Sequence, residues 1–292
     1  MKKYVQEATD INIWTSIKNN TFGRNKDIKE FIDGLELIDE SACISLDAKW
    51  GDGKTFFVRQ IEEVLKYVLV NQWADEENSI EKLPSYKYLK DNEMIAKMEL
   101  KHSYLPIYYN AWMYDNHSDP LMSLLLVMTK TCKGVYDTKI DSEKISKKLI
   151  EVVATLPISL GEFKANPFTA IEKLQGKSMD ILSLVQTEEE IRERVKGIFN
   201  DIIVERAQKL IIFIDELDRC RPSFAIEMLE RIKHYFDDER VIFVVSLNKE
   251  QLIHTITNYY GSGFDATRYL NKFFDVNINL PVMDRYQKQS IE

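Results

Sequence analysis

Short apolar runs recur along the chain, and each is typical of a buried β-strand. They lie at residues 43–47, 104–112, 209–214, 241–248 and 274–281. Their shortness and their wealth of β-branched and aromatic residues favour strands over helices. The run at 209–214 has no polar interruption after its first lysine, and such a strand is typical of a parallel sheet covered on both faces.

The segments between these runs carry apolar residues at helical spacing. A long amphipathic helix is predicted after Thr55, and further helices begin at Pro120 and Pro222, because proline suits the first turn of a helix. Strands that alternate with helices predict an α/β fold with a doubly wound, mostly parallel five-stranded sheet. A helix after residue 25 is indicated by four apolar positions on one face, Ile28, Phe31, Ile32 and Leu35.

Three segments fall outside this alternation. Residues 11–20 form an amphipathic lead-in. Residues 72–103 are charged and irregular, so we expect an insertion on the surface there. Residues 134–207 have mostly helical periodicity and would form a helical insert between two strands. We therefore expect one domain over residues 1–281 that contains both inserts, while residues 282–292 begin a C-terminal region or tail.

A loop of small residues joins the first strand to the following helix. The segment Ala48-Lys49-Trp50-Gly51-Asp52-Gly53-Lys54-Thr55 has the strand–loop–helix context of a P-loop and meets its pattern, G-x-x-x-x-G-K-[ST], except at Ala48. Glycines in such a loop let backbone N–H groups approach the β-phosphate. Lys54 would reach the β- and γ-phosphates, and the Thr55 hydroxyl would ligate Mg²⁺. The residues expected to contact the nucleotide are Trp50, Gly51, Asp52, Gly53, Lys54, Thr55 and Phe56.

Paired carboxylates follow the run at 209–214. Because parallel sheets bind ligands beyond the carboxyl ends of their strands, we expect Asp215 and Glu216 to lie near the loop of Lys54 and Thr55. Asp215 would hold Mg²⁺ through water, and Glu216 would orient and deprotonate the attacking water. The alternative is a strand that ends in solvated acids, and the P-loop upstream favours the catalytic interpretation.

Polar residues near two other strands extend the candidate site. Asn248 ends the fourth strand and either senses the γ-phosphate and the attacking water or caps a turn. Arg268 and Lys272 precede the last strand, and one of them would bring positive charge to the γ-phosphate, in cis or from a neighbouring subunit. A solvated helix face is the alternative for both side chains.

The second strand and the acidic motif add further candidates. Asn110 would position water near Glu216, whereas packing is the favoured role for Trp112. Asp218 and Arg219 would approach a second water-bridged position near Mg²⁺, hold a subunit contact or form a local ion pair.

The composition is that of an ordinary globular domain. The 292 residues are 45% hydrophobic and 29% charged, which suits one large α/β domain. A formal net charge of −8 argues against a generally basic surface, so a nucleic-acid partner stays uncertain. Cys43, Cys132 and Cys220 are scattered, which fits burial in a reducing cytosol. None of the 4 histidines has metal-ligand spacing.

The sequence contains no signal of a targeting segment or a membrane span. The N-terminus leads into charged and polar residues rather than an apolar signal core. The apolar stretch at 150–160 contains Glu151 and Pro157 and is too short to cross a bilayer. We therefore expect a cytoplasmic protein.

ATP is favoured over GTP as the nucleotide. Asn248 and Lys249 follow a strand as in the guanine-specificity motif N-K-x-D, but Gln251 occupies the position of the required Asp. The D-x-x-G signature is also missing, because Asp218 stands where its Gly would be. We expect ATP and Mg²⁺ as ligands.

Several motifs together resemble the KAP family of P-loop NTPases. They are Lys49–Thr55, Tyr109–Trp112, Ile214–Cys220, and Tyr269–Phe274 followed by Leu280-Pro281. The resemblance covers roughly residues 20–281. It implies ATP hydrolysis with Mg²⁺ and a regulatory or mobile-element defence role, often in bacteria. Many relatives carry transmembrane helices inserted within the NTPase domain, whereas this chain resembles a soluble variant without them.

We therefore expect a Mg²⁺-dependent ATPase whose conformational change drives a protein partner or an attached effector, for example in bacterial anti-phage defence. A homo-oligomer is compatible with this interpretation. Two alternatives stay open. A nucleotide-dependent binding switch with little turnover would be favoured by Ala48, and a nucleic-acid-stimulated motor would need a basic stripe.

Overall fold

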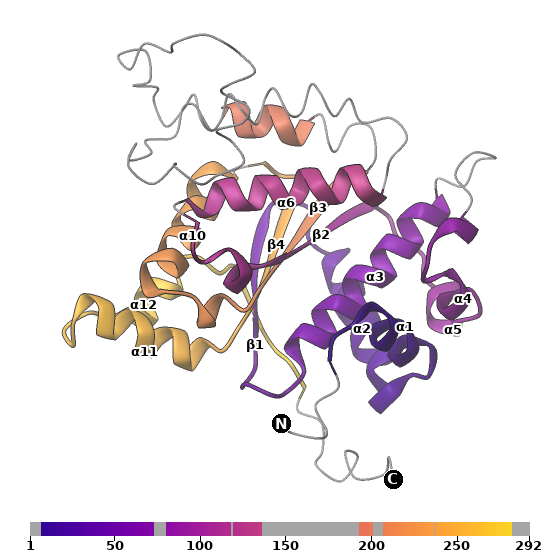
Figure 1. Ribbon diagram of the computed structural model, residues 1–292, viewed down its shortest axis with the longest axis horizontal. Helices are drawn as coiled ribbons and strands as arrows, with labels where there is room; N and C mark the ends of the chain where they lie inside the picture. The colour runs from indigo at the N-terminus through magenta and orange to yellow at the C-terminus, as the bar shows by residue number, and fades with distance from the viewer. Residues whose placement is uncertain are drawn as a thin grey trace.

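A five-stranded sheet in the order β2-β3-β4-β1-β5 forms the centre of the molecule, and every neighbouring pair is parallel. The computed structural model describes residues 7–72, 80–117, 119–135, 193–200, 207–236 and 238–281 (Figure 1). The α/β fold with a parallel five-stranded sheet, expected from the apolar runs, is confirmed. The strands are β1 (Ala42–Asp47), β2 (Tyr104–Asn110), β3 (Lys209–Asp215), β4 (Val241–Leu247) and β5 (Val276–Asn279).

Both faces of the sheet are buried, because side chains alternate between two separate cores. On β3, Leu210, Ile212 and Ile214 belong to one core. Ile211 and Phe213 belong to the other. Every residue of β3 and of β4 is buried, as expected for central parallel strands.

Helices cover both faces of the sheet (Figure 1). One core contains side chains of α1 (Asp10–Lys18), α2 (Arg24–Leu35) and α3 (Lys54–Gln72). The other contains side chains of α6 (Pro120–Val135), α10 (Pro222–Tyr235) and α11 (Lys249–Tyr260). The helices expected after residue 25, after Thr55, at Pro120 and at Pro222 are all present, and α1 occupies the lead-in at residues 11–20. The four apolar positions predicted for α2 are buried.

The segment between α3 and β2 contains short helices where an irregular chain was expected. They are η2 (Ile80–Lys82), α4 (Tyr86–Leu89) and α5 (Glu93–Ala96). Leu89 and Ile95 are buried in the core that α1 and α2 also line. Most of the helical insert predicted at residues 134–207 lies outside the described residues. Within the insert, residues 193–200 are described and form a helix.

The prediction that the second strand continues to Trp112 is wrong. The strand ends at Asn110, and a 3₁₀ turn, η3 (Ala111–Tyr114), follows it. The Asn110 side chain caps this turn by accepting a hydrogen bond from the Met113 N–H at 3.2 Å. An extended strand would forgo this bond, so the cap accounts for the early end of β2.

The chain after β3 and β4 is built from short elements as well. They are η6 (Leu217–Arg219), which follows β3, and α12 (Ala266–Leu270), which packs against α11. Near the N-terminus, the short η1 (Thr21–Gly23) precedes α2. All three cysteines are buried, as expected. Within the described ranges, no helix combines the length and the apolar character needed to cross a bilayer.

Candidate functional site

The two predicted motifs meet at the carboxyl edge of the sheet. β4 lies between β1, which leads into the glycine loop, and β3, which ends in Asp215. Asp47 is level with Leu247 across one pair of strands, and Ile214 is level with Val245 across the other. The loop and the carboxylates therefore emerge at the same height on either side of one strand, as expected from the sequence.

The loop after β1 depends on glycine for its backbone conformation. Gly51 and Gly53 have φ values of +90° and +87°. A Cβ atom at either position would meet open space, so conformation rather than crowding requires glycine. Ala48 is not among the described non-glycine residues with positive φ. The departure from the P-loop pattern at Ala48 therefore falls where alanine is conformationally acceptable.

Lys54 opens α3 and folds back over its own loop. Its Nζ donates hydrogen bonds to the carbonyl oxygens of Ala48 at 2.6 Å and Lys49 at 3.2 Å. Burial lowers the pKa of Lys54, and the carboxylates of Asp218 and Asp215 oppose that shift. Lys54 is thus a nearly buried cation within electrostatic reach of the acidic end of β3.

Asp215 is the most deeply buried acid of the site, with 1% of its surface exposed. Its Oδ2 accepts a hydrogen bond from the Tyr108 hydroxyl at 3.0 Å, and its Oδ1 accepts one from the Glu216 N–H at 3.0 Å. A carboxylate offers about four lone-pair positions, so both oxygens retain capacity for metal-bound water.

Glu216 combines an unusual backbone with a fixed side chain. Its φ of 61° and ψ of 27° are left-handed values that non-glycine residues seldom adopt outside functional or tightly constrained sites. Asn110 Nδ2 donates to its Oε2 at 3.1 Å, and Arg219 pairs with its Oε1 at 3.2 Å. Asn110 therefore contacts the carboxylate near which it was expected to position water.

The other residues of the acidic motif bridge to aromatic side chains. The Trp50 indole N–H donates to Asp218 Oδ2 at 2.5 Å, which joins the glycine loop to the chain after β3. The Arg219 guanidinium lies 5.6 Å from the ring centroid of Trp112. Packing is the role predicted for Trp112, and its ring contacts Arg219 while 54% of its surface is exposed. The strand ends before it, so the indole projects from a surface turn.

The remaining residues of the loop and of β4 lie at the same edge. Thr55 and Phe56 occupy the first turn of α3, and Phe56 packs against the core beneath it. The Asp52 N–H donates to the Lys49 carbonyl at 3.3 Å and so closes the turn in the loop. Asn248 caps α11, because its Oδ1 accepts from the Gln251 N–H at 3.2 Å. Its Nδ2 is chemically able to donate to a phosphate.

Lys272 lies at the opposite edge of the sheet from the loop. Its carbonyl accepts a hydrogen bond from Lys233, in the last turn of α10. Three residues later, the Asp275 carboxylate accepts from the Cys43 N–H at 2.8 Å, at the amino end of β1. A strand of 6 residues spans about 20 Å. Lys272 therefore cannot reach the loop of its own chain, and the expectation of a cis contribution from it is wrong.

Arg268 is exposed on the short helix α12. Its backbone N–H donates to the Asp265 side chain at 2.9 Å, which caps that helix. Helix α12 packs against α11. None of the hydrogen bonds or ion pairs of the described residues joins Arg268 to the loop or to the end of β3.

Two side chains that contact the site escaped the sequence analysis. Tyr108 bonds Asp215, and the Arg59 guanidinium lies 4.7 Å from the Tyr108 ring centroid. One signal in the sequence could have indicated Arg59. It stands four residues after Thr55, and residues at this spacing share a face of a helix. Nothing in the sequence around Tyr108 distinguishes it from the other aromatic residues of the strand.

The residues at this edge suit a magnesium ion. Mg²⁺ prefers oxygen ligands and keeps several waters, so it is usually held by few protein groups together with substrate phosphates. Thr55 offers a hydroxyl at the start of α3, and Asp215 offers carboxylate oxygens with spare capacity. Within the described ranges, no group of three or more His, Cys, Asp or Glu side chains could hold a metal ion, so binding here would depend on few protein groups together with nucleotide phosphates.

The parallel sheet, the glycine loop that opens α3 and the paired carboxylates across one strand define a P-loop NTPase. The family model described as the KAP family P-loop domain matches residues 24–291, so the chain belongs to that family. The resemblance inferred from its motifs is confirmed. Membership indicates nucleotide binding and hydrolysis. A comparison with curated proteins finds none that matches this chain.

Proposed function

We propose that the chain binds ATP with Mg²⁺ at the loop of Gly51 to Thr55 and hydrolyses the γ-phosphate. The observation that carries this proposal is the meeting of Lys54 with Asp215 and Glu216 at one sheet edge. Phosphoryl transfer requires positioning and charge neutralisation more than covalent chemistry, and this edge offers both. Absence of the guanine-specificity residue, where Gln251 stands, favours ATP over GTP.

Each residue has a distinct role in this proposal. The loop amides and Lys54 bind the phosphates, and Glu216 orients the attacking water and accepts its proton. Thr55 would ligate Mg²⁺ directly and Asp215 would hold it through water. When bound, the metal would neutralise charge that develops on the transferred phosphate. Asn248 would donate through Nδ2 to the γ-phosphate or the water while Oδ1 keeps α11 capped.

The side-chain contacts of Lys54 and Glu216 bear on how the site would receive phosphate and water. Lys54 bonds carbonyls of its own loop, and both oxygens of Glu216 have partners in Asn110 and Arg219. A bound γ-phosphate would compete for Lys54, because a phosphate oxygen is a stronger acceptor than a carbonyl. Each Glu216 oxygen has one partner and keeps a lone-pair position that would accept a hydrogen bond from the attacking water.

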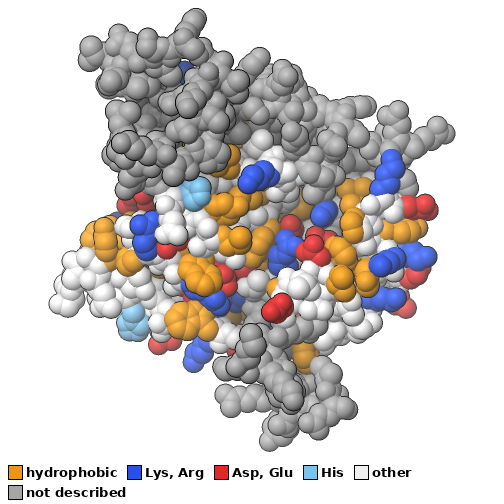
Figure 2. Space-filling model, viewed as in Figure 1, with side chains coloured by type: hydrophobic (Ala, Val, Ile, Leu, Met, Phe, Trp, Pro, Cys, Tyr) orange, Lys and Arg blue, Asp and Glu red, His pale blue; other side chains and the backbone are white. Residues whose placement is uncertain are grey.

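Hydrolysis would drive a conformational change in a protein partner or an attached effector, and we propose anti-phage defence in bacteria as its setting. Support for that setting comes from the family resemblance alone. A nucleic-acid-stimulated motor is the weaker alternative. On the face shown in Figure 2, Lys and Arg side chains of the described residues are interspersed with acids, in keeping with the net charge of −8.

A neighbouring subunit would supply the positive charge that Lys272 cannot deliver within its own chain. Arg268 or Lys272 of a second copy would then approach the γ-phosphate in a homo-oligomer. Mixing inactive Lys54→Ala subunits with inactive Arg268→Ala or Lys272→Ala subunits should restore part of the activity. A protein that stays monomeric with a non-hydrolysable ATP analogue, across a concentration series in light scattering, would contradict this assembly.

Equilibrium binding of labelled ATP tests the site itself. Lys54→Ala should weaken binding by roughly 10- to 100-fold, the cost of losing one charge-assisted contact. Lys26→Ala is the matched control, because Lys26 forms only an exposed ion pair with Glu30 on α2. The proposal fails if Lys54→Ala and Lys26→Ala bind ATP as tightly as the wild-type protein.

A further inference from the structure

The Tyr108 hydroxyl is the only side-chain donor that the described residues supply to the Asp215 carboxylate. Tyr108 lies on β2 and reaches across to the end of the neighbouring strand β3. Its 3.0 Å hydrogen bond to Oδ2 fixes one oxygen of the carboxylate, while the Glu216 N–H fixes the other. Two donors therefore define the rotation of the carboxylate. They also define the directions in which its free lone pairs point.

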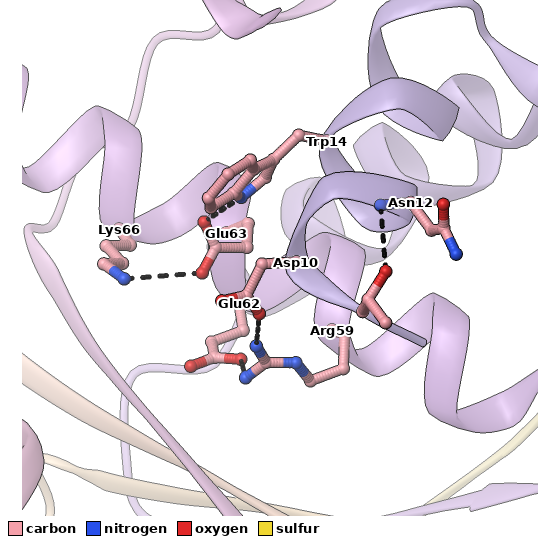
Figure 3. Close-up of polar contacts among 8 residues, drawn as sticks. Asp10, Asn12, Trp14, Arg59, Glu62, Glu63 and Lys66 are labelled. Carbon is pink, nitrogen blue, oxygen red and sulfur yellow. Dashed lines mark hydrogen bonds and ion pairs between the residues drawn. The ribbon is translucent and has the colours of Figure 1, made fainter. Parts of the chain in front are cut away.

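Arg59 holds the Tyr108 ring from the other side. Its guanidinium lies 4.7 Å from the ring centroid, within the distance of a cation–π contact. Arg59 stands one helical turn after Thr55 on α3. The same guanidinium pairs with Glu62 and, at 2.7 Å, with Asp10 of α1 (Figure 3). A planar guanidinium with several donors can make these contacts at once, which a lysine could not.

Helix α1 docks on α3 through further polar contacts. The Trp14 indole N–H donates to Glu63 Oε2 at 2.6 Å, and Lys66 pairs with the same carboxylate at 3.4 Å (Figure 3). Gln60 Nε2 donates to Ser16 Oγ at 2.8 Å. These contacts are directional, so they fix α1 in one orientation above the face of α3 that carries Arg59.

The series of contacts is continuous from α1 to the metal carboxylate. It runs from Asp10 through Arg59 and Tyr108 to Asp215. Its first member lies outside the part of the chain that the family model matches, residues 24–291. The remaining members lie on the helix and strands that build the site.

We infer that Tyr108 and Arg59 are positioning residues that orient Asp215 for Mg²⁺, and that docked α1 keeps Arg59 in place through Asp10. The inference rests on the proposed function, because it concerns the metal of the same site. It makes α1 part of the support of the metal site, since loss of the Asp10 contact would leave Arg59 with Glu62 as its remaining ion-pair partner and hold the Tyr108 ring less firmly.

Calorimetry of ATP binding over a series of Mg²⁺ concentrations tests this inference without relying on turnover. Tyr108→Phe keeps the ring beneath Arg59 and removes only the hydroxyl. It should raise the Mg²⁺ concentration for half-maximal enhancement of ATP binding about tenfold, the loss of one hydrogen bond to a charged group. ATP affinity in EDTA should stay at the wild-type value, because a phosphate contact is not involved.

Asp10→Asn tests the outer end of the series. It should shift the same midpoint in the same direction by about twofold, because the Asp10 side chain is 59% exposed and its ion pair is screened. Asp33→Asn is the matched control, since Asp33 pairs with Lys29 on the surface of α2 at 2.6 Å. That control should leave the midpoint unchanged.

The outcomes separate the inference from the proposed function. A wild-type protein whose ATP binding ignores Mg²⁺ would overturn both. Wild-type enhancement by Mg²⁺ with the same midpoint in Tyr108→Phe would overturn the inference alone. If Tyr108→Phe does not fold, as judged by circular dichroism, Asp10→Asn decides: a midpoint equal to that of Asp33→Asn overturns the inference, and a higher one supports it.

Discussion

The glycine loop and the acidic end of β3 face each other across one strand but are held in different ways. In the loop, Lys54 and the Asp52 N–H bond carbonyls no more than six positions away in the chain. At the end of β3, Asp215 and Glu216 receive hydrogen bonds from Tyr108 and Asn110 of β2. The loop is thus shaped by its local sequence, whereas the carboxylates are oriented by another strand.

This difference assigns nucleotide binding to the loop and hydrolysis to the carboxylates. A loop that shapes itself is ready for phosphate as soon as β1 and α3 form, which suits a binding element. Carboxylates that depend on neighbouring elements respond to movements of those elements, which suits regulation of hydrolysis. Changes within the loop should therefore act on ATP affinity, and changes around β3 should act on turnover, metal dependence or stability.

The largest effect expected from a change in the backbone conformation of the loop is that of Gly53→Ala. A φ of +87° is strained for alanine by roughly 1–2 kcal/mol, so ATP affinity should fall about tenfold if the loop must relax to another shape. Gly34→Ala is the control, because a Cβ atom there also meets open space but the residue lies in helix α2 at an ordinary φ. It should leave affinity unchanged and stabilise the protein by up to about 1 kcal/mol. Equal affinities in the two variants would show that the loop does not need its glycine.

A smaller effect is expected where the two regions touch. Trp50→Phe removes the indole donor to Asp218, a carboxylate that is only 7% exposed. The free energy of unfolding in urea should fall by about 1–2 kcal/mol, because a largely buried acceptor loses a partner. Trp112→Phe keeps an aromatic face beneath Arg219 and should change stability by less than about 0.5 kcal/mol. Indistinguishable losses in the two variants would refute a specific bridge.

The smallest effect concerns the acid that pairs with Arg59. Burial raises the pKa of Glu62 from 4.5 to about 7, and Arg59 opposes the shift. A folded pKa above the unfolded one means that this contribution to stability is complete below about pH 4.5 and lost as pH rises through 7. Glu62→Gln should therefore reduce the fall in stability between pH 5 and 7.5 by about 1 kcal/mol in thermal unfolding. Glu93→Gln, at an exposed surface pair, should keep the wild-type slope, and a wild-type slope in Glu62→Gln would contradict the assignment.

The sheet and the two motifs were predictable because their signals are local. Apolar runs, helical spacing and the Gly-Lys-Thr segment each report on a few neighbouring residues, and the alternation of strands with helices indicates a parallel sheet. The departure from the P-loop pattern at Ala48 is also explained locally, because Ala48 is not among the described residues with positive φ.

The sequence predicts Asn110 near Glu216 but does not predict Tyr108 at Asp215, because such contacts depend on register and on side-chain direction. The hydrogen bonds of Tyr108 to Asp215 and of Asn110 to Glu216 each join residues more than 100 positions apart. The end of β2 was placed two residues too late because the Asn110 cap competes with strand pairing. For Arg268 and Lys272 the sequence leaves open a contribution in cis or from a neighbouring subunit, because proximity to β5 in the chain does not say which edge of the sheet a residue occupies.

A single-turnover measurement with Glu216→Gln tests the central claim, that this edge of the sheet hydrolyses ATP with Glu216 as base. Gln keeps the size of the side chain but cannot accept the proton of water. The account predicts ATP affinity close to that of the wild-type protein and hydrolysis of bound ATP slowed roughly 10²-fold or more. Hydrolysis at the wild-type rate in Glu216→Gln, with ATP still bound, would contradict it.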